Sequence, residues 1–316
     1  MKSNQFNSLW QKYGTFGILV LIIFILGIIS PQYFFTGSNL TQVILQSSIN
    51  IIVGVGEFFP ILIAGIDLSV GSIMALTGMI TAKLLVAGVP VVLSVLIGGL
   101  VVGALLGFIN GYLVVKTNLH PFIITLGTLS IFRGLTLIIS DARPVYGLPI
   151  EFTQGIAGYI WFIPIPVIIA LSLAIVLIFV TNKTKLGRNI YAIGGNTQAA
   201  WFSGINVKLY TIVVFMISGV CAGIAGVVLT ARLGAAEPLA GTGFELFAIA
   251  AAIIGGTSFF GGKGRIIGVV MGALIIGVIN NGLNILNVPT YYQQIVMGSL
   301  IIGAVALDRF FANKKS

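Results

Sequence analysis

Charged side chains are rare in this sequence. Lysine, arginine, aspartate and glutamate make up 7% of its 316 residues, whereas 58% are hydrophobic. A water-soluble domain cannot cover its surface with so few charges, so the composition excludes that class and indicates a chain embedded in a lipid bilayer. Cysteine and histidine occur once each, as Cys221 and His120. A single cysteine excludes an internal disulfide, and one histidine far from it in the sequence excludes a His–Cys metal site.

Motifs for enzymatic chemistry are also missing. The sequence contains no nucleophile elbow and no paired-carboxylate arrangement. The glycine-rich run at residues 256–263 is one residue too long for a phosphate-binding loop, and Gly264 stands where a magnesium-binding Ser or Thr would be needed. We therefore expect no enzyme, no nucleotide and no cofactor bound by this chain. The net charge of +9 is assigned to cytoplasmic loops of a membrane protein rather than to a nucleic-acid partner.

Long apolar runs fill most of the sequence. With a helix rise of about 1.5 Å per residue and a hydrocarbon core of about 30 Å, they predict an all-α polytopic membrane protein with about ten transmembrane helices. The eighth run is so short that we expect it to be tilted or partly re-entrant. The expected spans are residues 14–30, 40–64, 70–87, 91–115, 121–140, 163–180, 209–231, 246–256, 266–286 and 291–307.

The basic residues are consistent with this arrangement of spans. With both termini in the cytoplasm, most of the 16 lysines and arginines fall in cytoplasmic segments, as the positive-inside rule requires. Arg143 and Arg232 fall in outer loops, and Lys83 and Arg133 fall within spans. The distribution therefore predicts that both termini are cytoplasmic.

Two parts of the sequence resemble each other. Gly-Ile-Asp-Leu at residues 65–68 follows the second span, and Gly-Phe-Glu-Leu at residues 243–246 follows the seventh. Asn-Gly pairs then occur in the fourth and ninth spans, in the same order and at similar spacing. Spans two to five and seven to ten, about residues 40–140 and 209–307, are therefore predicted to be inverted repeats within a single transmembrane domain of residues 1–316.

Polar side chains recur at helical spacing in the second and ninth spans. Gln42, Gln46, Asn50 and Glu57 share one face of the second span. Amides both donate and accept hydrogen bonds, which suits the hydroxyl groups of a sugar, although such amides also join helix to helix. The residues predicted to line a translocation pathway are Gln46, Asn50, Glu57, Asn280, Asn281 and Asn284.

Four ionisable residues lie within or between the spans. Glu57 and Arg133 have similar depth, so either an ion pair or a role in transport is open. Asp67 and Glu245 follow glycines and precede helices, where a carboxylate can accept hydrogen bonds from free backbone N–H groups. We predict that both act as caps.

Four segments of the chain resemble one family. They are GIDLSVG at residues 65–71, HPFIITLG at 120–127, the stretch 187–205, and IIGGTSFFGGKGR at 253–265. They are similar to the ribose-type permease subunits of bacterial ABC sugar importers, and the resemblance covers nearly the whole chain. Within this family, GEFF at 56–59 and the stretch 218–241 are most similar to the D-allose branch, although the ribose, xylose and galactose branches share most motifs.

The resemblance implies a type II ABC-importer-like fold and a set of partners. A homodimeric permease would lie among the lipids of the cytoplasmic (inner) membrane of a bacterium and carry D-allose or ribose. A separate ATPase would bind ATP and Mg, and an extracytoplasmic sugar-binding protein would deliver the substrate.

The polar segment 182–208 is, by this resemblance, the cytoplasmic coupling loop. Asn196 can cap a short helix in it and Gly204 can end that helix, while small residues allow close docking and Trp201 offers an anchor. An ordinary interfacial helix is the alternative. The residues expected to contact the ATPase are Gly194, Gly195, Asn196, Ala199, Ala200, Trp201, Ser203 and Gly204.

Charged residues of the outer segments are candidates for contact with the binding protein. Simple solvation is the alternative for each of them. They are Asp141, Arg143, Glu151, Arg232 and Glu237.

Two other classes of membrane protein stay open. An ion-coupled secondary transporter would share the inverted repeat, but it needs a titratable cluster at mid-membrane, for which Glu57 and Arg133 are thin support. A receptor-like scaffold would need no polar stripe, so substitution of Gln46, Asn50 and Asn284 would leave uptake unchanged.

Overall fold

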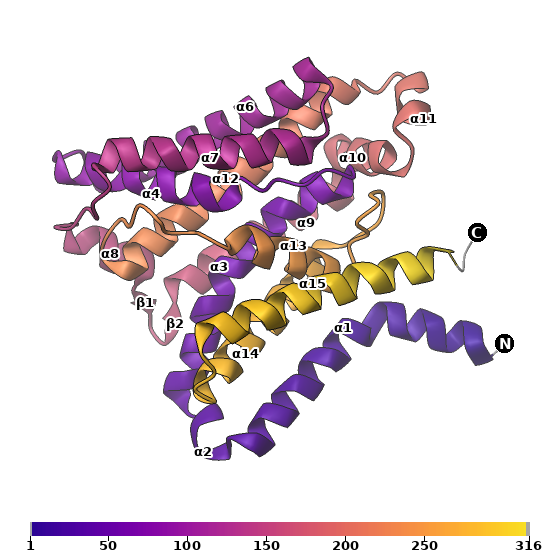
Figure 1. Ribbon diagram of the computed structural model, residues 1–316, viewed down its shortest axis with the longest axis horizontal. Helices are drawn as coiled ribbons and strands as arrows, with labels where there is room; N and C mark the ends of the chain where they lie inside the picture. Colours follow the sequence, from indigo (N-terminus) through magenta and orange to yellow (C-terminus); the bar gives the residue numbers. More distant parts are fainter. Residues whose placement is uncertain (1, 314–316) are drawn as a thin grey trace.

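Helices make up most of the computed structural model, which describes residues 2–313 (Figure 1). A π-helical segment, η1 (Leu96–Val101), joins α5 to α6, and β1 (Tyr159–Ile160) pairs antiparallel with β2 (Ile163–Pro164). The α-helices are α1 (Lys2–Ile29), α2 (Pro31–Phe34), α3 (Gly37–Leu62), α4 (Val70–Val86), α5 (Val91–Val95), α6 (Val102–Thr117), α7 (Pro121–Ser140), α8 (Ile150–Ala157), α9 (Ile165–Lys183), α10 (Lys185–Gly195), α11 (Thr197–Phe202), α12 (Val207–Leu233), α13 (Phe244–Ile254), α14 (Ile266–Ile285) and α15 (Thr290–Asn313).

Every apolar run predicted as a span lies largely in helical structure. Among the described residues, six helical stretches are long and apolar enough to cross a membrane: α3, α5 to α6, α7, α9, α12 and α14. Shorter apolar helices are formed by Gly14–Ile29, α4 and α13. The polytopic helical fold is therefore confirmed, and the short eighth run is confirmed as the 11-residue α13. The count of ten spans and the inverted repeat stay predictions.

The two chain ends lie at one end of the molecule. In Figure 1 both are on the right, where α10 and α11 also lie, whereas α8 and the β1–β2 hairpin are at the left. The segment with most of the predicted coupling residues is therefore separated from α8 by the length of the spanning helices.

α3 is the central helix. Its residues from Ser47 to Leu62 are all buried, because α3 contacts α9, α12, α13 and α14. By contrast, the most apolar windows of α7 and α9 are 22% and 28% buried, so most of their side chains are at least partly exposed. The polar residues Ser47, Ser48, Asn50 and Glu57 of α3 are thereby kept in the interior of the protein.

α6 and α12 pack with their backbones in close approach. A Cβ added at Gly107 of α6 would meet the carbonyl of Phe215, and one added at Gly103 would meet that of Gly219 on α12. Small residues four positions apart allow such contacts between membrane helices, where burial of apolar surface does not drive association. α12 also contacts α3 and α4, and α6 also contacts α4, so the pair fixes much of the interior.

Candidate functional site

The chain turns back into the protein after α3. The backbone N–H of Asp67 donates to Glu57 Oε1 at 2.9 Å, which places Asp67 beside a residue ten positions earlier. Both side chains are fully buried. Residues 63–69 therefore form an inner re-entrant segment, and α4 begins inside the protein at Val70.

A second re-entrant segment, residues 234–243, follows α12. Arg133 lies about two turns before the end of α7, and its Nη1 donates to the carbonyls of Pro238 and Ala240, both at 2.8 Å. Glu245 Oε1 accepts from the backbone N–H of Gly243 at 3.2 Å. This segment thus reaches into the protein to the level of Arg133, about two turns from the end of α7, and it leads into the short helix α13.

The two short helices meet at their N-terminal ends. A Cβ added at Gly71, in the first turn of α4, would collide with the carbonyl of Gly241 and with the Glu245 carboxylate. Helix N-termini carry free N–H groups and a partial positive charge. The buried Asp67 and the half-buried Glu245 lie where those ends meet, and both accept backbone hydrogen bonds as predicted.

Asp67 is the centre of a buried polar cluster. Its Oδ1 accepts from the Ser69 N–H (3.0 Å), the Ser69 hydroxyl (2.6 Å) and Asn110 Nδ2 of α6 (3.4 Å), and its Oδ2 accepts from the Ser218 hydroxyl of α12 (3.0 Å). Asn110 Nδ2 also donates to Ser69 Oγ at 2.7 Å. The inner re-entrant segment is therefore tied to two helices that come from distant parts of the sequence.

Some buried polar atoms of α3 and α6 are unpaired. Asn50 Nδ2, Glu57 Oε2 and Asn110 Oδ1 are buried with no hydrogen-bond partner among the residues that the structure describes. They comprise one donor and two acceptors in the interior of the helix bundle. A hydroxylated ligand could satisfy them, whereas a nucleophile and its base are not brought together here.

The predicted pathway residues fall into two groups. Asn50, Glu57 and Asn280 are buried, and Gln46 of α3 is partly buried. Asn281 exchanges two hydrogen bonds with Asn39, at 2.7 and 3.1 Å, and so joins α14 to the start of α3.

Asn284 accepts from Gln293 of α15 at 2.8 Å and is exposed. For Asn281 and Asn284, the helix-joining alternative describes the observed contacts.

Of the two alternatives left open for Glu57 and Arg133, the ion pair is contradicted. Glu57 binds the N–H of Asp67 and Arg133 binds backbone carbonyls, so in the described part of the chain they do not bind each other. Similar depth does not place two side chains on facing surfaces. Sequence reasoning also missed Ser69 and Ser218, and it used Asn110 as a repeat marker without assigning it a role.

The predicted coupling helix is present as α11. Asn196 Oδ1 accepts from the Ala199 N–H at 2.9 Å, and Gly204, with φ of 83°, follows the last turn, so both predicted ends are confirmed. Trp201 and Phe202 are 62% and 80% exposed. Gly195, Asn196, Ala199 and Ser203 are also exposed.

Two residues of the predicted coupling set face the interior instead. Ala200 is buried, and a Cβ added at Gly194 would collide with the Leu62 carbonyl at the end of α3. A small residue can serve a partner or a neighbouring helix equally well, so the sequence did not separate these roles. Ala200 and Gly194 therefore pack α11 and the end of α10 against the rest of the protein.

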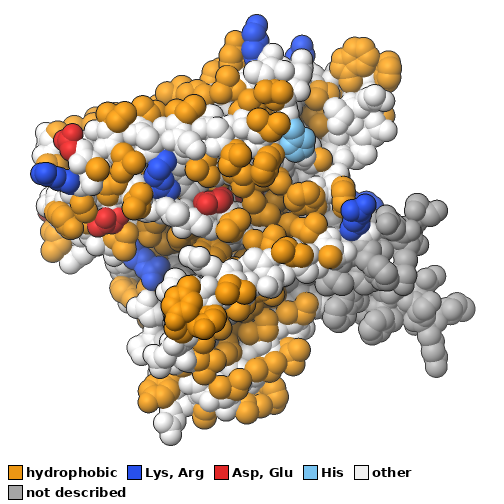
Figure 2. All heavy atoms as spheres, in the orientation of Figure 1, with side chains coloured by type: hydrophobic (Ala, Val, Ile, Leu, Met, Phe, Trp, Pro, Cys, Tyr) orange, Lys and Arg blue, Asp and Glu red, His pale blue; other side chains and the backbone are white. Residues whose placement is uncertain are grey.

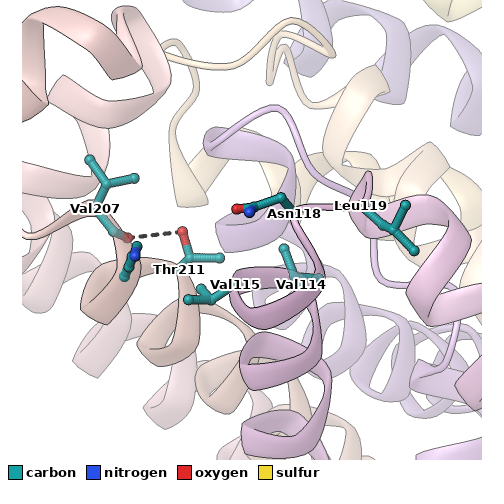
Figure 3. A pocket seen from close by; sticks show the side chains of 7 residues that line it. Val114, Val115, Asn118, Leu119, Val207 and Thr211 are labelled. Atoms are coloured by element: carbon teal, nitrogen blue, oxygen red, sulfur yellow. Dashed lines mark hydrogen bonds between the residues drawn. The ribbon is translucent and has the colours of Figure 1, made fainter.

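A shallow groove runs beside α11. Figure 3 shows its first part, where Asn118, in the turn after α6, points toward Val207 and Thr211 of α12. Val114 and Leu119 also line this part. A second depression shares Asn118 and Val207 and extends along α11 to Trp201. The exposed Trp201 side chain thus borders a concave surface.

The charged residues of the opposite end differ in their contacts. Asp141, Arg143 and Glu151 are exposed, and Glu237 is partly buried. Arg232 Nη2 lies 3.4 Å from Gln42 Oε1, its hydrogen-bond acceptor.

On the face in Figure 2, hydrophobic side chains predominate. Several of the few charged side chains gather at the left, the end of the molecule where α8 lies (Figure 1).

The Asp67 cluster generates a prediction about stability. Asp67→Ala removes an acceptor of four hydrogen bonds and should lower the free energy of unfolding by about 3 kcal/mol, whereas Ser218→Ala removes one bond and should lower it by about 1 kcal/mol. Thermal and chemical unfolding of the detergent-purified variants measures both. Equal losses for the two variants would contradict the central position of Asp67.

Comparisons with known proteins give the family. Residues 39–305 match the family model described as branched-chain amino acid transport system / permease component. The chain is 63% identical over 311 residues to the D-allose transport system permease protein of Escherichia coli, covering 98% of this chain and 95% of that protein. It is 44% identical over 310 residues to the ribose import permease protein of Bacillus subtilis, covering 98% and 96%, and 42% identical over 305 residues to that of Haemophilus influenzae, covering 95% and 94%. No solved structure matches the chain. The chain belongs to the branched-chain amino acid transport system / permease component family.

Proposed function

We propose that the chain is the transmembrane permease subunit of an ATP-driven importer that moves a monosaccharide across the cytoplasmic membrane of a bacterium. The observation that carries this proposal is the 63% identity over nearly the full length to a D-allose permease. The lower identity to ribose permeases, 42 to 44%, favours D-allose over ribose as the substrate. Galactose permeases are 36 to 38% identical, which makes that sugar a weaker alternative.

The pathway for the sugar runs where the two short helices meet. The unpaired atoms of Asn50, Glu57 and Asn110 supply donors and acceptors of the kind that sugar hydroxyls need. Because these residues are buried, the pathway would be closed in this conformation. In transporters built from inverted repeats, substrates bind at the junction of the repeats beside short helix ends. Residues 40–140 and 209–307 would be these repeats, and the two re-entrant segments support that reading because each follows the first helix of its repeat.

The permease works with partners. A second copy of the chain completes the pathway, an extracytoplasmic sugar-binding protein docks near the exposed charges of Asp141, Arg143 and Glu151, and an ATPase with its ATP and Mg lies below α11. Both chain termini would then be cytoplasmic, since they lie at the end of the molecule that contains α10 and α11 (Figure 1). The chain itself performs no chemistry.

The exposed face of α11 suits docking to the ATPase. Trp201 and Phe202 are large, exposed and adjacent to the groove at Asn118, a combination typical of anchor residues at protein interfaces. Behind them, Tyr191 of α10 donates its hydroxyl to the Gly264 carbonyl at 2.8 Å.

The segment before α14 is in turn held to α3, because Gly262 N donates to the Leu62 carbonyl at 2.8 Å. A displacement of α11 therefore reaches the ends of α3 and α14. ATP-driven motion of the ATPase would drive alternating access through these contacts.

The experiment that tests the function is uptake by proteoliposomes. The permease, its ATPase and its sugar-binding protein are reconstituted together, and labelled D-allose is compared with labelled ribose. We expect accumulation that needs ATP and the binding protein, with D-allose taken up faster. Uptake driven by a proton or sodium gradient without the ATPase would contradict the proposal and favour a secondary transporter. Faster uptake of ribose would overturn only the assignment of D-allose as the substrate and would leave the importer function in place.

A single substitution tests the docking surface. Gly195 at the end of α10 is exposed with open space around it, so Gly195→Trp should leave the fold intact and weaken ATPase binding by about tenfold or more, equivalent to about 1.4 kcal/mol. Gly155→Trp is the matched control, because Gly155 is equally open but lies on α8 at the opposite end. The measurement is the affinity of the purified ATPase for each variant in nanodiscs. Equal affinities of the two variants for the ATPase would contradict docking of the ATPase at α11 and its surroundings.

A further inference from the structure

A short aromatic hairpin stands between α8 and α9. β1 and β2 pair Tyr159 with Pro164 and Ile160 with Ile163, which leaves Trp161 and Phe162 at the tip. Trp161 is 92% exposed and Phe162 is 79% exposed. In Figure 1 the two strands project from the body of the molecule at the end opposite α10 and α11. The most exposed part of the hairpin is therefore its most aromatic part.

The tip has an unusual residue for its backbone. Two-residue hairpin turns favour Asn, Asp or Gly, which tolerate a positive φ. Trp161 has φ of 59°, a conformation that bulky residues rarely adopt. Residues held in such conformations are associated with functional constraints. Turn formation therefore does not account for a tryptophan at position 161, and we attribute it to a role of the side chain.

The length of α9 fixes the level of the hairpin in a bilayer. α9 begins directly after β2 and has 19 residues up to Lys183, which corresponds to about 28 Å, close to the hydrocarbon core of about 30 Å. With Lys183 at one border of the core, the hairpin lies at the other border. Residues 152–182 contain no Asp, Glu, Lys or Arg, so nothing in the hairpin opposes contact with lipid.

The lipid-facing surface of α9 continues into the hairpin. Leu171, Ile175 and Val176 are exposed on α9, and Tyr159 and Ile160 are exposed on β1. Tryptophan and tyrosine favour the boundary between hydrocarbon and headgroups, because their rings are apolar and their N–H and O–H groups can meet polar headgroups. The chemistry of the exposed residues thus matches the level at which they lie.

We propose that the hairpin of residues 159–164 is an interfacial anchor that inserts Trp161 and Phe162 into the headgroup boundary of the leaflet opposite α10 and α11. Its partner is the lipid surface. The anchor holds the adjoining end of α9 at a fixed depth while helices of the interior move. This inference depends on the membrane-spanning fold and not on the identity of the sugar or of the ATPase.

Fluorescence of the full chain in nanodiscs tests the anchor. The sequence has three tryptophans, Trp10, Trp161 and Trp201, so Trp10→Phe with Trp201→Phe leaves Trp161 as the sole reporter. The nanodiscs contain phosphatidylcholine brominated either near the ester groups or near the chain ends. We expect a larger loss of Trp161 emission with bromine near the ester groups. As the matched control, Trp161→Phe and Ile175→Trp added to the same background move the reporter to the middle of α9, where bromine near the chain ends should quench more.

Two results would overturn the proposal. In one, Trp161 emission is the same in brominated and unbrominated nanodiscs while the Ile175→Trp reporter is quenched, which places the hairpin in water. In the other, lipid bromine has no effect on Trp161 but the sugar-binding protein shifts its emission, which makes the hairpin a protein-docking element.

Discussion

Backbone-to-backbone contact at glycine is the constraint on which the rest of this structure depends. In a bilayer, burial of apolar surface no longer drives helices together, so close packing and hydrogen bonding must hold them. Three such contacts join the parts of this protein: α6 to α12 at Gly107, α4 to the segment before α13 at Gly71, and α10 to the end of α3 at Gly194. In each case, a Cβ would collide with a carbonyl oxygen of the neighbouring segment. At these positions there is therefore no room for even a methyl group between the two backbones.

These contacts connect the exposed surface of α11 with the buried polar cluster. α11 follows α10, α10 lies against Leu62 at the end of α3, and α3 carries Glu57, which binds the backbone of Asp67. Asp67 is tied to α6 and α12, and the first turn of α4 reaches the carbonyl of Gly241. The path is short and alternates close backbone contacts at glycine with hydrogen bonds of buried side chains. Rigid contacts of this kind suit the transmission of a displacement, which the proposed coupling to an ATPase requires.

Much of the fold could be predicted from the sequence, because apolar runs and helix caps are local signals. The short α13 and the cap at Asn196 belong to this group. Asp67 and Glu245 accept backbone hydrogen bonds at the starts of α4 and α13, although the N-cap positions themselves are Ser69 and Gly243. The tertiary contacts could not be predicted in the same way. Similar depth left a Glu57–Arg133 pair open, although the two side chains bind different segments. Small size placed Ala200 among the residues expected to contact the ATPase, although it is buried. The contacts of Asn110 and Ser218 with Asp67 arise because distant helices meet, and no local pattern records that.

The contact at Gly71 offers the most direct test of this account. Gly71→Ala adds one methyl group where the carbonyl of Gly241 and the Glu245 carboxylate lie, whereas Gly134→Ala adds the same group on α7 with open space around it. The measurement is ATP-driven sugar uptake by each variant, at equal amounts of folded protein in proteoliposomes. The account predicts that uptake is lost in Gly71→Ala and retained in Gly134→Ala. Normal uptake by Gly71→Ala would contradict it.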